Sequence, residues 1–348
     1  IPFALIIIPL FLSLFIALPI LIIGPYLNFN FSSVLLFSGI LAFSDYLRAH
    51  ILTGFPWNLW AYSTVWLNEI IQLVNSIGFY SYNLILITFF TLPAITFFRV
   101  SITKKVIYFI LVSLVTLSLF IFGNHTINKN IKQLREVNDK VFIKIISPNF
   151  DLKYGLNEEE IEERLKKLIR YSNPTKDKKT VFIWPEGIFS GYSYEEVSIF
   201  KDLIIKNFSE EHVIIFGINQ IDRKSKNFYN SMLAVDNNFN IVSSYNKRRL
   251  VPFGEFLPFE NFLNNFGFKK ITEGHGSFLR GNKNNNISIN KINFLPLICY
   301  EVIFTDLVQK SNLNTNLIIN ISEDGWFGNT IGPDQHFAKS IFRAIENN

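Results

Sequence analysis

The sequence contains a single cysteine, and this cysteine occupies a position typical of a nucleophile. Cys299 follows the apolar run 292–298, which predicts a buried strand, and Tyr300 and Glu301 come next. A thiol at the end of a strand can be presented at the edge of a sheet. A lone cysteine is most often a small buried apolar residue, so its potential partners must decide between the two interpretations.

Two further segments offer partners for this thiol. Glu186 follows Trp184 and Pro185 at the end of another predicted strand, and Lys247 precedes Glu255 across a short rigid segment. The first carboxylate could take the thiol proton, the lysine could donate to a developing oxyanion, and the second carboxylate could hold the lysine. Each of these residues alone is more often a solvated surface group. Together, on the expected kinds of element, they indicate acyl transfer through a thioester.

Apolar residues are concentrated in the first third of the chain, although 49% of all 348 residues are hydrophobic. Four runs are candidate membrane spans, the second weakened by Asp45: residues 1–23, 31–47, 79–98 and 106–122. A signal peptide does not explain the first run, because further spans follow it. We therefore predict a transmembrane domain at 1–123 and a catalytic domain at 124–348. Both ends lie inside apparent elements, so we expect a fragment that lacks both ends.

Basic residues in the short loops predict the orientation of the chain. Residues 99–105 carry three positive charges, whereas Arg48 is the only lysine or arginine in the loop 48–78. Positive charges favour the cytoplasmic side, so we expect the catalytic domain on the periplasmic side. The loop 48–78 also contains Trp57, Trp60 and Trp66. These aromatics fit either an interfacial belt or a lipid-facing floor beneath the catalytic domain.

Strands and helices alternate in the second part of the chain. We predict strands at 141–147, 180–184, 213–218, 228–235, 239–245, 292–298 and 317–321, and helices at 158–171, 194–208, 304–310 and from 335. This alternation indicates a layered α/β or α+β domain. No glycine-rich phosphate loop and no cluster with metal-ligand spacing stands out, so we expect no cofactor and no metal. No basic patch interleaves with exposed aromatics, which disfavours nucleic-acid binding.

The combined motifs resemble the apolipoprotein N-acyltransferases, membrane enzymes of the nitrilase superfamily. The matching segments are 52–57, 184–186, 245–247, 250–255, 298–301, 325–328, 332–333 and 335–336. The resemblance implies an αββα sandwich with a catalytic triad of Glu186, Lys247 and Cys299. It also implies supporting or substrate-binding roles for Glu255, Tyr300, Glu301, Trp326 and Tyr154. The chain departs from the family pattern at Tyr154, where tryptophan is common, and at Glu323, where asparagine is common.

The resemblance further implies a ping-pong reaction at the bacterial inner membrane. Glu186 would take the Cys299 proton, and the thiolate would attack the sn-1 ester of a phospholipid, typically phosphatidylethanolamine. Lys247 and the backbone N–H of Tyr300 would hold the oxyanion. The thioester would then acylate the α-amine of a diacylglyceryl-cysteine at the N-terminus of an apolipoprotein, the last step of lipoprotein maturation. Trp326 would line the way in from the bilayer.

Three other functions are compatible with parts of the sequence. A membrane-anchored amidase of the nitrilase type would share Glu186, Lys247 and Cys299, but it would have no use for the motif 54–57. A receptor or scaffold without activity would make all three identities coincidental. A transporter is disfavoured because the apolar runs contain few ionisable residues of the kind that mark substrate pathways.

Overall fold

The computed structural model describes residues 4–28, 30–135, 141–260, 276–282, 286–289, 292–308 and 315–347. Contacts between residues divide the chain into two compact units. The first comprises Ile1–Val137, Ile303–Thr305 and Gln335–Asn348, and the second comprises Asn138–Val302 and Asp306–Asp334. The domain boundary near residue 123 stays a prediction, whereas the last helix clusters with the first unit.

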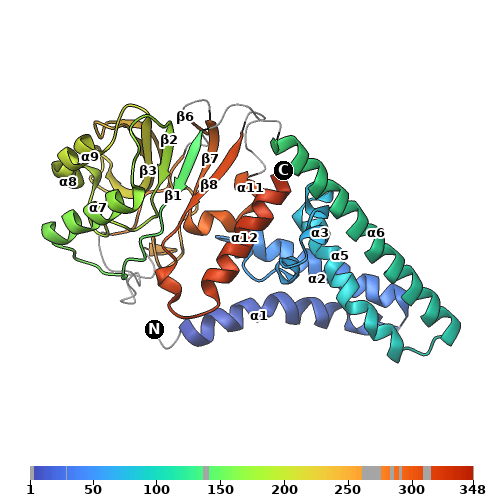
Figure 1. Ribbon diagram of the computed structural model, residues 1–348. Helices are drawn as coiled ribbons and strands as arrows, with labels where there is room; N and C mark the ends of the chain where they lie inside the picture. The colour runs from blue at the N-terminus through green and yellow to red at the C-terminus, as the bar shows by residue number, and fades with distance from the viewer. Residues whose placement is uncertain are drawn as a thin grey trace. The chain divides into compact units, whose positions relative to one another are not determined.

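The first unit is helical throughout its described part (Figure 1). Its elements are α1 (Ala4–Ile23), η1 (Gly24–Tyr26), α2 (Phe31–His50), η2 (Trp60–Thr64), α3 (Asn68–Ile71), α4 (Leu73–Ile77), α5 (Phe79–Thr91), η3 (Leu92–Phe97), α6 (Ile102–Arg135) and most of α12 (Gly332–Asn347). Among the residues that the structure describes, three segments are long and apolar enough to cross a membrane: Ile6–Tyr26, Phe79–Phe97 and Ile102–Gln133. They correspond to three of the four predicted spans.

The helices α1 and α6 expose long rows of large apolar side chains. In α1, for example, Ile6, Leu10 and Leu21 are more than half exposed, and in α6 Phe109 is exposed as well. A soluble protein rarely leaves so large an apolar surface in water. These helices are therefore suited to lipid, and the chain is a membrane protein.

The interior of the first unit is built around α12, which begins at Gly332 rather than at the predicted Gln335. Phe342 of this helix is fully buried and packs against Tyr62, Phe79 and Tyr82. The motif 54–57 is tied to the same helix, because Trp57 Nε1 donates to Gln335 Oε1 at 2.8 Å. The loop 48–78, which contains Trp57, is thus part of a packed core as well as a candidate membrane contact.

A buried ion pair closes the end of α2. Arg48 Nη2 lies 2.8 Å from Asp45 Oδ1, and both side chains are less than 10% exposed. Arg48 also donates to the carbonyl oxygens of Phe55 and Asn58, while Asn83 of α5 donates to Asp45. Asp45 is therefore neutralised inside the unit. The interpretation of 31–47 as a span stays a prediction.

The described part of the second unit contains two sheets (Figure 1). The larger has the order β1-β2-β3-β4-β5, with β1 (Phe142–Ile145), β2 (Thr180–Ile183) and β3 (His212–Ile221) parallel, and β4 (Phe228–Val235) and β5 (Ile241–Asn246) antiparallel. The smaller has β6 (Ile287–Ile289) antiparallel to β7 (Ile292–Ile298), and β7 parallel to β8 (Leu317–Ile321). Both layers follow from strands that bury alternate residues on opposite faces.

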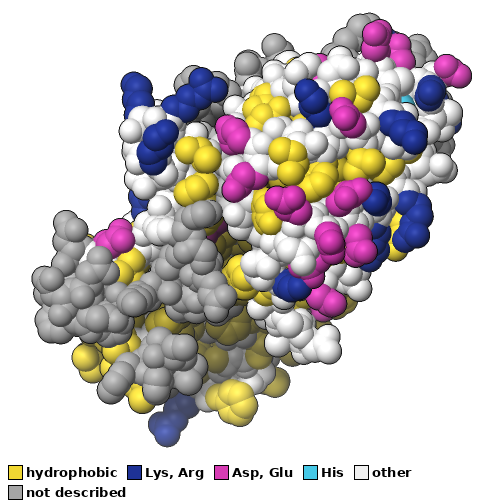
Figure 2. Space-filling model, turned by 90° about the vertical axis from the view of Figure 1, so that its left-hand side faces the viewer, with side chains coloured by type: hydrophobic (Ala, Val, Ile, Leu, Met, Phe, Trp, Pro, Cys, Tyr) yellow, Lys and Arg dark blue, Asp and Glu magenta, His cyan; other side chains and the backbone are white. Residues whose placement is uncertain are grey.

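One face of the larger sheet is covered by the helices that connect its parallel strands. These are α7 (Glu158–Ser172), α8 (Tyr194–Val197) and α9 (Lys201–Asn207), which contribute to one apolar core with Phe182 and Phe216. Figure 2 shows charged side chains of both signs scattered over this side of the unit. The other face packs against the smaller sheet, where Ile183 and Ile215 meet Ile298 and Ile321. The nitrilase-like sandwich expected from the sequence is confirmed.

Most predicted elements are present, with three differences. The helix predicted at 194–208 is divided into α8, η4 (Ser198–Phe200) and α9, because the backbone at Phe200 leaves helical geometry. The short strand β6 was not predicted. The helix predicted at 304–310 occurs as α11 (Thr305–Val308), and its last two residues lie outside the described part of the chain.

Candidate active site

Glu186 is placed by the end of β2. The fully buried Trp184 continues the pairing with β3 through a backbone bond to Ile215, and its indole donates to the Ser172 hydroxyl at 2.9 Å. Two residues later Glu186 passes over Gly217 so closely that a Cβ at Gly217 would lie 2.7 Å from the Glu186 Cα. Glycine is therefore required in β3, and Glu186 is held by backbone rather than by a flexible loop.

Lys247 directly follows β5 and is almost completely buried, with 1% of its side chain exposed. Its backbone N–H donates to the Asn230 carbonyl of β4, which extends the antiparallel pairing. Its Nζ lies 2.9 Å from Glu255 Oε1 and 3.5 Å from Glu186 Oε1. The Asn230 amide donates to both of these carboxylate oxygens at 2.7 Å. One ammonium and one amide therefore join the two acids.

Cys299 begins the turn η5 (Cys299–Ile303) directly after β7. Its φ is +49°, a left-handed conformation that costs energy in a residue with a side chain. Such strain occurs at sites where a side chain must be presented at a sharp turn. The residue as a whole is partly buried. The Ser322 side chain, just beyond β8, hydrogen-bonds to this thiol.

The electrostatics connect Cys299 to the two charged partners. Burial, and after it the Glu186 carboxylate, raises the pKa of the Cys299 thiol, while the Lys247 ammonium lowers it. Burial alone would lower the pKa of Lys247, but Glu186 and Glu255 outweigh it and hold that pKa well above its ordinary value. Lys247 therefore stays charged, whereas the thiol stays protonated until a base removes its proton.

Glu301 is fully buried and holds neighbouring segments of the site together through hydrogen bonds. Its carboxylate accepts hydrogen bonds from the Tyr245 hydroxyl and from the backbone N–H groups of Arg248, Arg249 and Ile298. Burial raises the pKa of Glu301, and these backbone donors oppose the rise. The carboxylate thereby connects the strand ends that carry Lys247 and Cys299. Tyr300 is buried beside it.

Tyr154 and Trp326 form a pair on the outer side of the unit. Their ring centroids are 5.7 Å apart, and Trp326 is 49% exposed. Trp326 belongs to the turn η6 (Asp324–Phe327), which follows Glu323. The Glu323 backbone N–H in turn donates to Glu186 Oε2 at 3.3 Å. The structure thus connects this aromatic pair to Glu186 through a short segment.

Three polar residues of this group were not singled out from the sequence, namely Asn230, Tyr245 and Ser322. Asn230 lies in β4 among buried apolar residues, and a polar side chain in such a strand was the available signal. Among the residues that the structure describes, no group of three or more His, Cys, Asp or Glu side chains could hold a metal ion.

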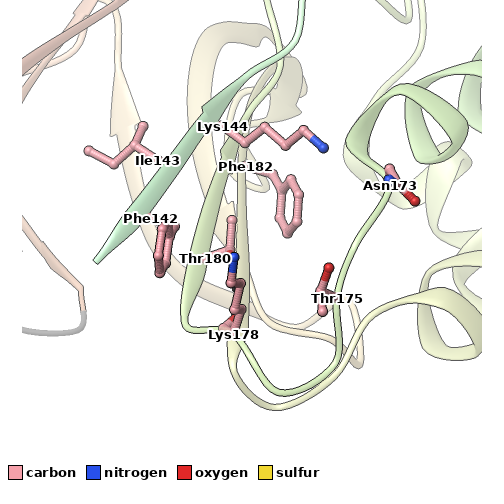
Figure 3. Close-up of a pocket in the computed structure, with 8 residues that line it drawn as sticks. All are labelled: Phe142, Ile143, Lys144, Asn173, Thr175, Lys178, Thr180 and Phe182. Carbon is pink, nitrogen blue, oxygen red and sulfur yellow. The ribbon is translucent and has the colours of Figure 1, made fainter. Parts of the chain in front are cut away.

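A separate cavity of about 190 Å³ lies at the opposite end of the parallel strands (Figure 3). Phe142 and Thr180 are the first residues of β1 and β2, whereas Glu186 follows the last residue of β2. The Lys144 ammonium at this cavity donates to the Ser172 carbonyl. The cavity is lined by Phe142, Ile143, Lys144, Asn173, Thr175, Lys178, Thr180 and Phe182, so it is separate from the candidate active site.

Similarity to known proteins covers the whole chain. Residues 152–348 match the carbon-nitrogen hydrolase family, and residues 1–92 match the N-terminal domain of apolipoprotein N-acyltransferases. The apolipoprotein N-acyltransferase of Rickettsia prowazekii is 30% identical over 352 residues, which is all of this chain and 68% of that protein. The corresponding protein of Rhodopseudomonas palustris is 31% identical over 88% of this chain. The chain spans 59% of that relative.

Solved structures with a nitrilase-type fold also align with part of the chain. The carbon-nitrogen hydrolase of Helicobacter pylori aligns over 59% of this chain and 68% of its own, with a TM-score of 0.38 and 14% identity. Saccharomyces cerevisiae Nit3 aligns over 49% of this chain and 61% of its own, with a TM-score of 0.35 and 15% identity. On the sequence relationships above, the chain belongs to the apolipoprotein N-acyltransferase family of carbon-nitrogen hydrolases.

Proposed function

We propose that this protein transfers a fatty acyl chain from a phospholipid to the N-terminal α-amine of an apolipoprotein, through a thioester on Cys299. The observation that carries the proposal is the close grouping of Lys247 with Glu186 and Glu255, which act electrostatically on the strained Cys299. Membership of the acyltransferase family supports the same reaction. The acceptor is the diacylglyceryl-cysteine of the apolipoprotein.

In the first half-reaction, Glu186 takes the thiol proton and the sulfur attacks the ester carbonyl of the phospholipid. The carbonyl electrons move to oxygen, where the Lys247 ammonium and the Tyr300 N–H stabilise the negative charge. The intermediate collapses with cleavage of the ester C–O bond. Glu186 returns its proton to the departing alkoxide, so a lysophospholipid leaves and a thioester remains.

In the second half-reaction, the α-amine attacks the thioester carbonyl and loses a proton to Glu186. The C–S bond breaks, and the Cys299 sulfur regains a proton from Glu186. Glu255 contacts Lys247 rather than the reacting atoms, so its role is to hold that ammonium in place. Trp326, with Tyr154 behind it, offers an exposed aromatic surface to the acyl chain.

The lipid-suited helices of the first unit match the substrates of this reaction. A soluble enzyme would have to extract each acyl chain from the bilayer, at a cost of about 0.8 kcal/mol per CH₂ group. An enzyme anchored in the bilayer avoids that extraction. We place the catalytic unit on the periplasmic side of the inner membrane, because residues 99–105, which include the first turn of α6, carry three positive charges.

The proposal is tested by searching for the acyl-enzyme. The full-length protein is incubated with phosphatidylethanolamine vesicles, and the peptide that contains Cys299 is analysed by mass spectrometry. We expect an acyl mass on this peptide in the wild type, none in Cys299→Ser or Glu186→Gln, and loss of the acyl mass on addition of a diacylglyceryl-cysteine peptide.

Two results would contradict the proposal. Hydrolysis of a small amide without any acyl mass on Cys299 would identify an amidase. Normal acylation by Glu186→Gln would remove Glu186 from the role of base. Glu195→Gln is the control, because it changes an exposed carboxylate of α8 and should leave the acyl mass unchanged. Glu196→Gln is a poor control, because Glu196 caps the same helix.

A further inference from the structure

Glu323 is a carboxylate beside Glu186 that the proposed reaction does not use. It follows β8 and Ser322, and its backbone N–H donates to Glu186 Oε2 at 3.3 Å. Gly187 has a φ of +72° and leaves room for the Glu323 side chain, because a Cβ at Gly187 would lie 3.1 Å from Glu323 Cβ and Cγ. Glu323 is therefore packed directly against the segment that carries Glu186.

The carboxylate of Glu323 also organises the turn that follows it. Its Oε1 accepts a hydrogen bond from the Gly325 N–H at 3.1 Å, which caps η6. That turn carries Trp326, whose ring lies against Tyr154. One residue thus connects Glu186 with the exposed aromatic surface.

The charges on the two sides of Glu186 differ. One of its oxygens faces the Lys247 ammonium and the Asn230 amide, with Glu255 and the Cys299 thiol close behind. The other oxygen faces Glu323. The Glu186 carboxylate disfavours ionisation of Glu323, so the two carboxylates repel each other.

Glu323 itself faces more negative than positive charge. Asp324 and Glu186 are its acidic neighbours, and Arg164 of α7 is the cation that acts on it. The Arg164 guanidinium also donates to the carbonyl oxygens of Ile188 and Asp151, so it is shared among several acceptors. Burial raises the pKa of Glu323, Glu186 adds to the rise, and Arg164 and the Gly325 N–H oppose it.

We propose that Glu323 is a positioning residue for Glu186, which it orients through its backbone N–H and strengthens as a base through its carboxylate. The proposal deepens the proposed function, since it rests on Glu186 acting as the base. Its consequence is a pH dependence at Cys299 that is set in part by residue 323. Replacing Glu323 by a neutral side chain of the same length should move the pH dependence of the Cys299 reaction to lower pH.

The single cysteine gives a test that needs no substrate. Iodoacetamide alkylation of the full-length protein in detergent is followed by mass spectrometry on the peptide that contains Cys299, and its rate is measured as a function of pH. Glu323→Gln keeps the backbone N–H and an acceptor for Gly325 but removes the charge. We expect the acid limb of its alkylation profile to move by about one pH unit toward acid. Glu323→Asp keeps the charge and should restore the wild-type midpoint.

Glu195→Gln is the matched control, because it makes the same change in net charge at an exposed position of α8. It should leave the midpoint unchanged. An unchanged midpoint in folded Glu323→Gln would overturn the proposal, and Glu323→Asn provides the same charge change should the glutamine variant fail to fold. Thioester formation is measured in parallel on phosphatidylethanolamine vesicles. A shifted midpoint without a wild-type thioester would refute the proposed function but support the role of Glu323.

Discussion

Replacement of Glu255 by glutamine should weaken both the fold of the catalytic unit and its reaction. Glu255 Oε1 lies 2.9 Å from the Lys247 ammonium, and its other oxygen accepts the Val251 N–H at 2.8 Å. Glutamine retains an oxygen acceptor and nearly the same shape. The substitution therefore removes mainly the charge that faces a buried ammonium.

The magnitude follows from the two distances. With an effective dielectric constant of about 20, the attraction of Lys247 is about 6 kcal/mol to Glu255 at 2.9 Å and about 5 kcal/mol to Glu186 at 3.5 Å. Glu186 remains in the variant, so Lys247 keeps one partner. We expect a loss of about 3 kcal/mol in the free energy of unfolding, at the lower end for breaking a buried pair.

The reaction should suffer more than the fold. Without Glu255, Glu186 is the carboxylate that remains in contact with Lys247. We expect the Lys247 ammonium to draw the Glu186 carboxylate away from the Cys299 thiol. Loss of a well-placed general base costs about 10²-fold or more in rate. We therefore expect thioester formation to slow by about 10²-fold.

The assay combines a melting curve with the rate of thioester formation. A loss of about 3 kcal/mol corresponds to a fall of roughly 6 to 12 °C in the melting temperature for a domain of this size. Glu159→Gln, at an exposed position of α7, is the matched control and should change neither quantity. Wild-type melting and wild-type rate in Glu255→Gln would refute the assignment of Glu255 as the residue that holds Lys247.

Three further substitutions test other parts of the structure. Gly217→Ala forces a Cβ to within 2.7 Å of the Glu186 Cα, which should destabilise the protein by about 1 to 3 kcal/mol. Because Glu186 is displaced, the alkylation rate of the Cys299 thiol should fall at least about tenfold. Trp326→Ala should raise the KM for phospholipid in a thioester assay with little change in melting temperature, because its ring is half exposed. Burial lowers the pKa of Lys339 to about 8 in the folded protein. Between pH 8 and roughly 10.5 the unfolded chain therefore binds more protons than the folded protein, so the free energy of unfolding should rise with pH in this range. Lys339→Met should flatten that rise in melting curves recorded against pH.

The strands could be predicted because each is a short apolar run with turn residues at its ends. The strands predicted at 180–184, 213–218, 228–235 and 239–245 occur as β2, β3, β4 and β5. The break between α8 and α9 could not be predicted, since 194–208 has a continuous helical pattern and tertiary packing decides where it bends. The strand β6 is only three residues long and therefore gives almost no periodic signal.

The candidate site was only partly visible in the sequence. Residue types and strand ends indicated Glu186, Lys247 and Cys299, which follow β2 and β5 of the larger sheet and β7 of the smaller sheet. Asn230 could be noticed as a polar residue in β4, but its bridging contacts could not be predicted, since they depend on the register that places Asn246 opposite Ser231. The contact between Glu323 and Glu186 joins positions 137 residues apart and depends on how the two sheets pack.

The ion pair between Asp45 and Arg48 has a consequence for membrane insertion. Two opposite charges on adjacent turns of α2 can move into a low-dielectric medium as a nearly neutral unit, at a smaller cost than a single charge. Arg48 then contributes little to the charge imbalance that orients a polytopic chain during its synthesis. We therefore expect that removing Arg99, Lys104 and Lys105 disturbs the topology far more than removing Arg48.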